Sequence, residues 1–175
     1  MTFEHKFGVY NAEGTMNNWL QTNITGWGIP AWMPSARVVF DYPEQSLISG
    51  HSGHAFSVTH LGSEAVEVYQ GNHTVGGSAG QMMQGMMEIN CWISKEQAGG
   101  AYPARLRQMG DMVGKLFSSA HQVEINNLYT STAAPSGVGG LINIRRANEV
   151  AVVADPNPDI MRRRFLAQYL WIERV

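Results

Sequence analysis

The clearest pattern in the chain is an alternation of apolar and polar residues over residues 86–94, followed by apolar residues at helical spacing. Alternation with a period of two predicts a strand with one buried face. After a glycine-rich turn, the helical spacing starts near Pro103 and is carried by Leu106, Met109, Met112, Val113, Leu116 and Phe117. It predicts an amphipathic helix whose apolar stripe covers the sheet. The segment QVEINNLYT directly after it is predicted to be a further strand.

The amino-terminal half of the chain predicts one short helix and three strands. The helix lies around residues 13–22 and leads into a connector rich in tryptophan and proline, WGIPAWMPS, so that helix and connector together occupy residues 1–35. The segments ARVVFDY, HAFSVTHLG and EAVEVYQG are predicted strands, the last two joined by a tight turn at Gly62 and Ser63. Residues 71–85 are rich in glycine and methionine and are predicted to form a flexible loop.

The last third of the chain is predicted to be mostly extended. Residues 141–145 and 150–153 have strand character, and DPNPD predicts a turn. The final segment fits both strand and helix spacing, but its aromatic and β-branched residues favour a long hairpin strand. Together these elements predict a single α+β domain over residues 1–175: a mostly antiparallel β-sheet with one long amphipathic helix packed on it and a short N-terminal helix.

Charge is sparse and unevenly divided. Charged residues make up 15% of the chain and the formal net charge is −2, which argues against a nucleic-acid-binding protein. Residues 1–100 hold three basic and eight acidic side chains, whereas residues 101–175 hold nine basic and six acidic ones. Opposite poles suit side-by-side association of identical subunits; chance variation in a chain of low charge is the alternative. The sequence contains no apolar run of about 18 residues and no signal segment, which predicts no membrane contact.

The sharpest candidate for chemistry is a group of three histidines, His51, His54 and His60. A metal site would need three or four ligands at about 2 Å from one ion. His54 and His60 would sit roughly 20 Å apart along a strand, so exposed loop histidines are the preferred interpretation. The phosphate-loop, nucleophile-elbow and paired-cysteine motifs are all absent from the sequence, and the single cysteine, Cys91, is predicted to be a small core side chain. We therefore expect no catalytic residue, no metal and no cofactor.

The strongest local charge is the run Arg162, Arg163 and Arg164. Two interpretations stay open: contact with phosphates or with an acidic partner surface, or a solvated strand in which Arg162 and Arg164 face solvent and Arg163 pairs with a neighbouring acid. If the C-terminal hairpin forms, Arg145 and Arg146 would join this run in a basic patch. The apolar candidates for a contact surface are the aromatic anchor Trp32 and the adaptable side chains of Met82, Met83 and Met86.

The order of these elements resembles that of the tail terminator proteins of long-tailed, siphovirus-like bacteriophages. The resemblance covers most of the chain. It is carried by the leading helix with NNWLQTNI, the sheet segments RVVFDY, VEVYQG and MEINCWIS, the helix PARLRQMGDMVGKLF, the strand QVEINNLY and the hairpin arm RRRFLAQYLWIERV. The connector WGIPAWMPS and the methionine-rich segment depart from the family pattern.

The resemblance implies a structural virion protein without catalytic residues. Proteins of this family form a ring, usually of six subunits, that caps the head-proximal end of the tail tube, stops its polymerisation and offers a docking surface for the neck. The implied partners are further copies of the chain, the tail tube protein and a neck or head-completion protein. The genome would pass through the lumen without sequence-specific binding, and the protein would be made in the host cytoplasm. The alternatives are a neck adaptor of the same particle and a small metal-dependent enzyme using His51, His54 and His60.

Overall fold

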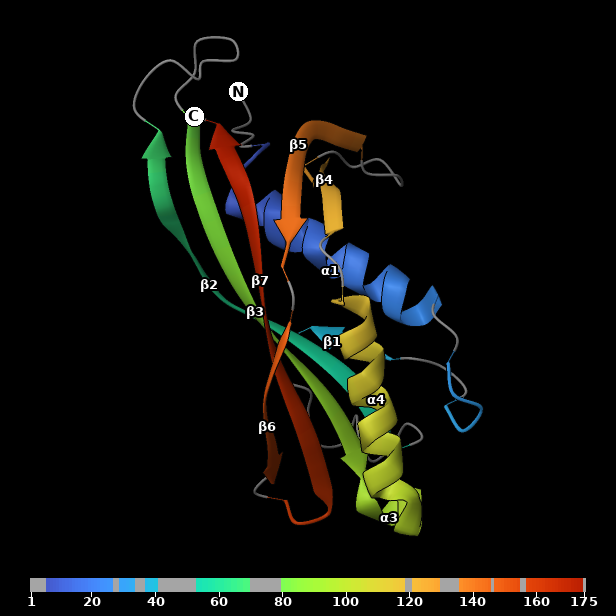
Figure 1. Ribbon diagram of the computed structural model, residues 1–175. Helices are drawn as coiled ribbons and strands as arrows, with labels where there is room; N and C mark the ends of the chain where they lie inside the picture. Colours follow the sequence, from blue (N-terminus) through green and yellow to red (C-terminus); the bar gives the residue numbers. More distant parts are fainter. Residues whose placement is uncertain are drawn as a thin grey trace.

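The protein folds into one twisted β-sheet with its two main helices on the same side (Figure 1). The computed structural model describes residues 6–26, 29–33, 37–40, 53–69, 80–118, 121–129, 136–145, 147–154 and 157–174. In chain order, the elements are α1 (Val9–Gly26), β1 (Val38–Phe40), β2 (His54–Tyr69), β3 (Gly80–Ser94), α3 (Lys95–Ala98), the 3-10 turn η1 (Gly99–Ala101), α4 (Tyr102–Leu116), β4 (His121–Asn127), β5 (Ser136–Ile144), β6 (Asn148–Ala154) and β7 (Ile160–Arg174).

The strand order across the sheet is β1-β2-β3-β7-β5-β4, and β6 pairs with the first half of β7. β1 runs parallel to β2, and the other described pairs are antiparallel. The sheet is therefore mixed, and the predicted mostly antiparallel sheet is only approximately right. The α+β class is confirmed. The three long strands β2, β3 and β7 lie side by side and twist strongly along their length (Figure 1).

Two predictions for the amino-terminal half of the sheet are wrong. The segments on either side of Gly62 form one continuous strand, because the register shift between His60 and Gly62 is a β-bulge and not a turn. β3 begins at Gly80, so residues 80–85 of the predicted flexible loop are strand, paired with both β2 and β7. Residues 71–79 of that loop lie outside the described residues.

Both predicted helices form, but the first is not short. α1 spans 18 residues and buries Ala12, Met16, Leu20 and Ile24 at a spacing of four. α4 starts with Pro103 in its first turn and buries Leu106, Met109, Val113 and Leu116 of the predicted stripe. Met112 is half-buried, and the buried Phe117 lies just after the end of the helix. Of the predicted connector, residues 29–33 are described and are not helical. Neither main helix is both long and apolar enough to cross a bilayer.

The predicted C-terminal hairpin strand is confirmed as β7, which pairs with β3 over its whole length. Its residues Phe165, Ala167, Tyr169 and Trp171 are buried in the same core cluster as residues from α1 and α4. Because successive strand residues point to opposite faces, the side chains between them lie on the other face of the sheet. The helices cover one face only, and we call the other one the open face.

Candidate functional site

In the half of the sheet that contains the bulge, the open face carries mostly apolar and uncharged polar side chains, with Glu64 among them. Cross-strand pairing places Glu64 beside Gln84, Gln84 beside Leu170 and Leu170 beside Asn143, so one row crosses four neighbouring strands. Large apolar side chains are exposed around this row: Leu61 is 47% exposed, Leu141 48% and Ile172 50%. Exposed apolar side chains gathered on one face are typical of an interaction surface.

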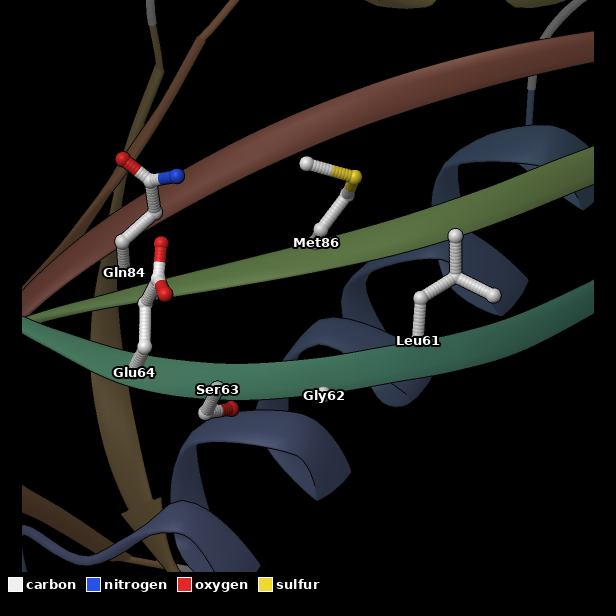
Figure 2. Close-up of a pocket in the computed structure, with 6 residues that line it drawn as sticks. All are labelled: Leu61, Gly62, Ser63, Glu64, Gln84 and Met86. Atoms are coloured by element: carbon white, nitrogen blue, oxygen red, sulfur yellow. The ribbon is translucent and has the colours of Figure 1, made fainter.

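A hollow of about 330 Å³ lies in this face and is lined by Leu61, Gly62, Ser63, Glu64, Gln84 and Met86. Figure 2 shows the side chains of Leu61, Glu64, Gln84 and Met86 on the open side, while Ser63 points toward α1. Gly62, at the β-bulge, is part of the lining of the hollow. Gly62 has a φ of 126°, which other residues rarely adopt, and a Cβ built there would meet nothing within 4 Å.

The predicted contact methionines divide between the two faces. By strand alternation, Met82 and Met86 lie on the open face, and both are half-buried. Met83 is 7% exposed and belongs to the core cluster, so its prediction as a contact residue is corrected. Trp32 stays half-buried: its Nε1 donates to Gln108 Oε1 at 2.5 Å and Arg105 lies 5.1 Å from its ring. It ties the connector to α4 and leaves part of its surface accessible.

Arg163 is part of the fold and not a free contact residue. Its Nε and Nη2 donate to the two carboxylate oxygens of Glu149 at 2.6 and 2.9 Å, which raises the pKa of Arg163. A Cβ on Gly110 of α4 would come within 2.8 Å of the Arg163 side chain, so this glycine makes room for it. The interpretation in which Arg163 pairs with a neighbouring acid is confirmed.

Arg162 and Arg164 lie on the open face but are half-buried, so their prediction as solvent-facing residues is wrong. Arg162 stacks over the Trp92 ring at 5.1 Å, and Arg164 Nη2 lies 2.5 Å from Glu88 Oε2. The Glu88 carboxylate is almost fully buried and also accepts a hydrogen bond from Asn90 Nδ2 at 2.8 Å. Arg164 is therefore part of a buried polar network in the sheet, whereas Arg162 packs on an aromatic ring.

The predicted joining of the two basic clusters is only partial. The Arg145 backbone N–H donates to Gln168 O, four residues along β7 from Arg164, which is about 13 Å at the rise of a strand. Arg145 itself is exposed. Arg146 lies outside the described residues.

The histidines are structural in the part of the chain that is described. His60 uses both ring nitrogens, with Nδ1 3.0 Å from Tyr169 Oη and Nε2 2.9 Å from Asn17 Oδ1. His54 is buried in β2 against Trp32, so the prediction of exposed loop histidines is wrong for both. His51 lies outside the described residues. Among the described residues, no group of three His, Cys, Asp or Glu side chains is arranged to hold a metal ion.

A polar cluster beneath α1 was not predicted from the sequence. Besides His60 and Asn17 it contains Glu13, whose pKa is raised by burial. Burial also raises the pKa of Tyr169. The cluster fixes the contact between α1 and the bulged part of β2.

Cys91 is expected not to react with a thiol reagent in the folded protein. Its side chain is fully buried on the helix-facing side of β3, and burial raises the pKa of the thiol, which removes the reactive thiolate. Labelling with a disulfide reagent at pH 8 should give no modification of the native chain and one equivalent after denaturation. Fast labelling of the native protein would show that this core opens readily.

Comparisons with known proteins identify the fold but no family. Twenty-two chains among the solved structures match this one. One of them is 7% identical, with a TM-score of 0.52 over 94% of this chain and 95% of its own, and its name states no function. No protein-family model matches the chain. No curated protein matches it either. At this level of identity the similarity concerns the fold alone.

Proposed function

We propose that this protein is a structural virion protein of the tail terminator type. It forms a ring, with six subunits as the expected number, that caps the head-proximal end of a tail tube, stops tube polymerisation and provides the docking surface for the neck. Its partners are copies of itself, the tail tube protein and a neck protein, while the genome passes through the lumen. It acts through shape and has no reacting group.

The open sheet face is the observation that carries the proposal. The sheet packs its helices on one side, and the other side exposes Leu61, Leu141 and Ile172 and contains a hollow lined by a single carboxylate, that of Glu64. A stable subunit contact buries roughly 800 Å² per partner and depends on a few apolar anchors more than on many charges. The half of this face that contains the hollow combines exposed apolar side chains with few charges among the described residues, which fits that requirement.

The order of elements adds support. A leading helix, a sheet that contains β2 and β3, the helix α4, the strand β4 and a long C-terminal arm follow one another as in the sequence resemblance to tail terminators. A histidine metal enzyme is the weaker alternative because both ring nitrogens of His60 already bond to side chains of the fold.

Removing the protein from the particle that carries it is expected to abolish the control of tube length. Because nothing would stop subunit addition at the head-proximal end, electron micrographs should show tubes with a broad length distribution and without attached heads. Adding the purified protein to growing tubes should restore a narrow distribution.

Tubes of unaltered length in its absence would contradict the proposal. A gold label on the protein locates it in the restored particle and is expected at the junction between tube and neck. A label on the portal side alone would identify a neck adaptor instead.

A further inference from the structure

The hollow of the open face has the chemistry of a binding site for one cationic side chain. Glu64 provides a carboxylate and Gln84 an amide oxygen at one side, and Leu61 and Met86 provide apolar walls (Figure 2). A guanidinium on a methylene stem matches both parts, because its N–H groups bind oxygen acceptors and its stem packs on apolar surface. The volume of the hollow, about 330 Å³, is at the small end of the range for ligand sites, which is roughly 300–1,000 Å³.

No described residue of the same chain binds the two acceptors of this hollow. The Glu64 side chain is exposed and makes no hydrogen bond or ion pair with a described residue, and the same holds for the Gln84 side chain. The Glu64 carboxylate and the Gln84 amide oxygen can therefore accept hydrogen bonds from a donor on another molecule.

Arg145 is our candidate for the cationic side chain that a second copy of the chain would place in the hollow. It follows β5, is exposed, and its guanidinium has no partner among the described residues. The row Glu64, Gln84, Leu170 and Asn143 puts β2 and β5 three strand spacings apart, about 14 Å. Arg145 lies two residues beyond Asn143, so its backbone is farther still from Glu64, and the two side chains form no ion pair in the structure.

We infer that the hollow of one subunit receives the side chain of Arg145 from a second copy of this chain, with Glu64 and Gln84 binding its guanidinium. Acceptor and donor lie toward opposite lateral sides of the sheet, which is the arrangement that head-to-tail contact requires. The acidic excess of residues 1–100 and the basic excess of residues 101–175 favour the same pairing. The inference rests on the proposed function only in that such a contact, repeated, closes the ring.

Reversing either charge is expected to weaken self-association, and reversing both is expected to restore it. In sedimentation velocity over a concentration series, Glu64→Arg and Arg145→Glu should each reduce the association constant about tenfold or more. The double variant should return to within about threefold of the wild type, because the pair re-forms with its charges exchanged. Glu96→Arg on α3 and Arg107→Glu on α4 are matched controls, since both side chains are exposed on helices. They should change association less than about twofold, in keeping with the small effects of surface charges.

A cysteine pair tests the direction of the contact. Glu64→Cys combined with Arg145→Cys adds two accessible thiols to a chain whose own cysteine is buried. Oxidation should then produce a ladder of cross-linked species longer than the dimer. Far-UV circular dichroism and the unfolding midpoint of each variant should match the wild type, since both residues are exposed.

The inference fails if the single variants associate like the wild type, if the double variant is as weak as the singles, if cross-linking stops at the dimer, or if the wild type is monomeric at every concentration. These outcomes are separate from the tube-length result. Charge variants with unchanged association that still cap tubes would reject the hollow and keep the proposed function. If the protein associates through the hollow but does not alter tube lengths, the inference about the hollow is kept and the proposed function is rejected.

Discussion

Replacing Gly85 with alanine is expected to lower the free energy of unfolding by about 3 kcal/mol. Gly85 pairs with Tyr169 across β3 and β7, and the tyrosine ring lies directly on the glycine: an added Cβ would sit 2.2 Å from Cζ. The ring has no room to move away, because it is fully buried, stacks on Trp171 at 5.6 Å and contacts His60 through its hydroxyl. Overpacking at this site must therefore displace a strand or break that network.

Urea denaturation of the Gly85→Ala variant measures this loss, and Gly114→Ala is its matched control. Gly114 lies in α4, and a Cβ there would meet nothing within 4 Å. The control should therefore gain up to about 1 kcal/mol, since alanine is the better helix former. A Gly85→Ala variant as stable as the wild type would show that Tyr169 is not held in this position.

Replacing Arg164 with leucine is expected to cost about 3 kcal/mol, because it leaves the buried carboxylate of Glu88 without its cation. Glu88 Oε2 lies 2.5 Å from Arg164 Nη2, and the Glu88 side chain is 2% exposed. The loss stays at the lower end of the range for a broken buried pair, since 34% of the Arg164 side chain is exposed to water.

Two further variants separate this explanation from a general loss of packing. Glu88→Leu combined with Arg164→Leu removes both charges and should recover at least half of the stability, because no unpaired buried charge remains. The neighbouring Arg163→Leu should cost about 1 kcal/mol or less, since its partner Glu149 is more exposed. Equal losses for the two single variants in denaturant unfolding would contradict the assignment of a buried pair to Arg164.

The fold could be predicted best where the burial of one face gives the sequence a regular spacing of apolar residues. The alternation of residues 86–94 and the helical spacing after Pro103 both reappear in β3 and α4. The aromatic residues of the C-terminal arm also predict a strand, and they lie on the buried face of β7. These periods depend only on which face of an element is covered, and not on what covers it.

The hollow on the open face could not be predicted from the sequence in the same way. The sequence around Gly62 predicts a turn and residues 71–85 a loop, which puts Leu61, Glu64 and Gln84 in separate elements. A glycine that permits a bulge and one that permits a turn look the same in a sequence. Only the pairing of β2 with β3 on both sides of the bulge distinguishes them.

By itself, the sequence determined the α+β class, the strand that leads into α4, the core position of Cys91 and the low charge density of the surface. The tertiary structure alone decided that Met82 and Met83 face opposite sides, that Arg163 and Arg164 bind different acids, and that β2, with Glu64, and β5, which precedes Arg145, are separated by two strands. The reason is physical: a local period records the burial of one element, whereas a site on a sheet depends on strand order and register, which arise only when distant segments pair.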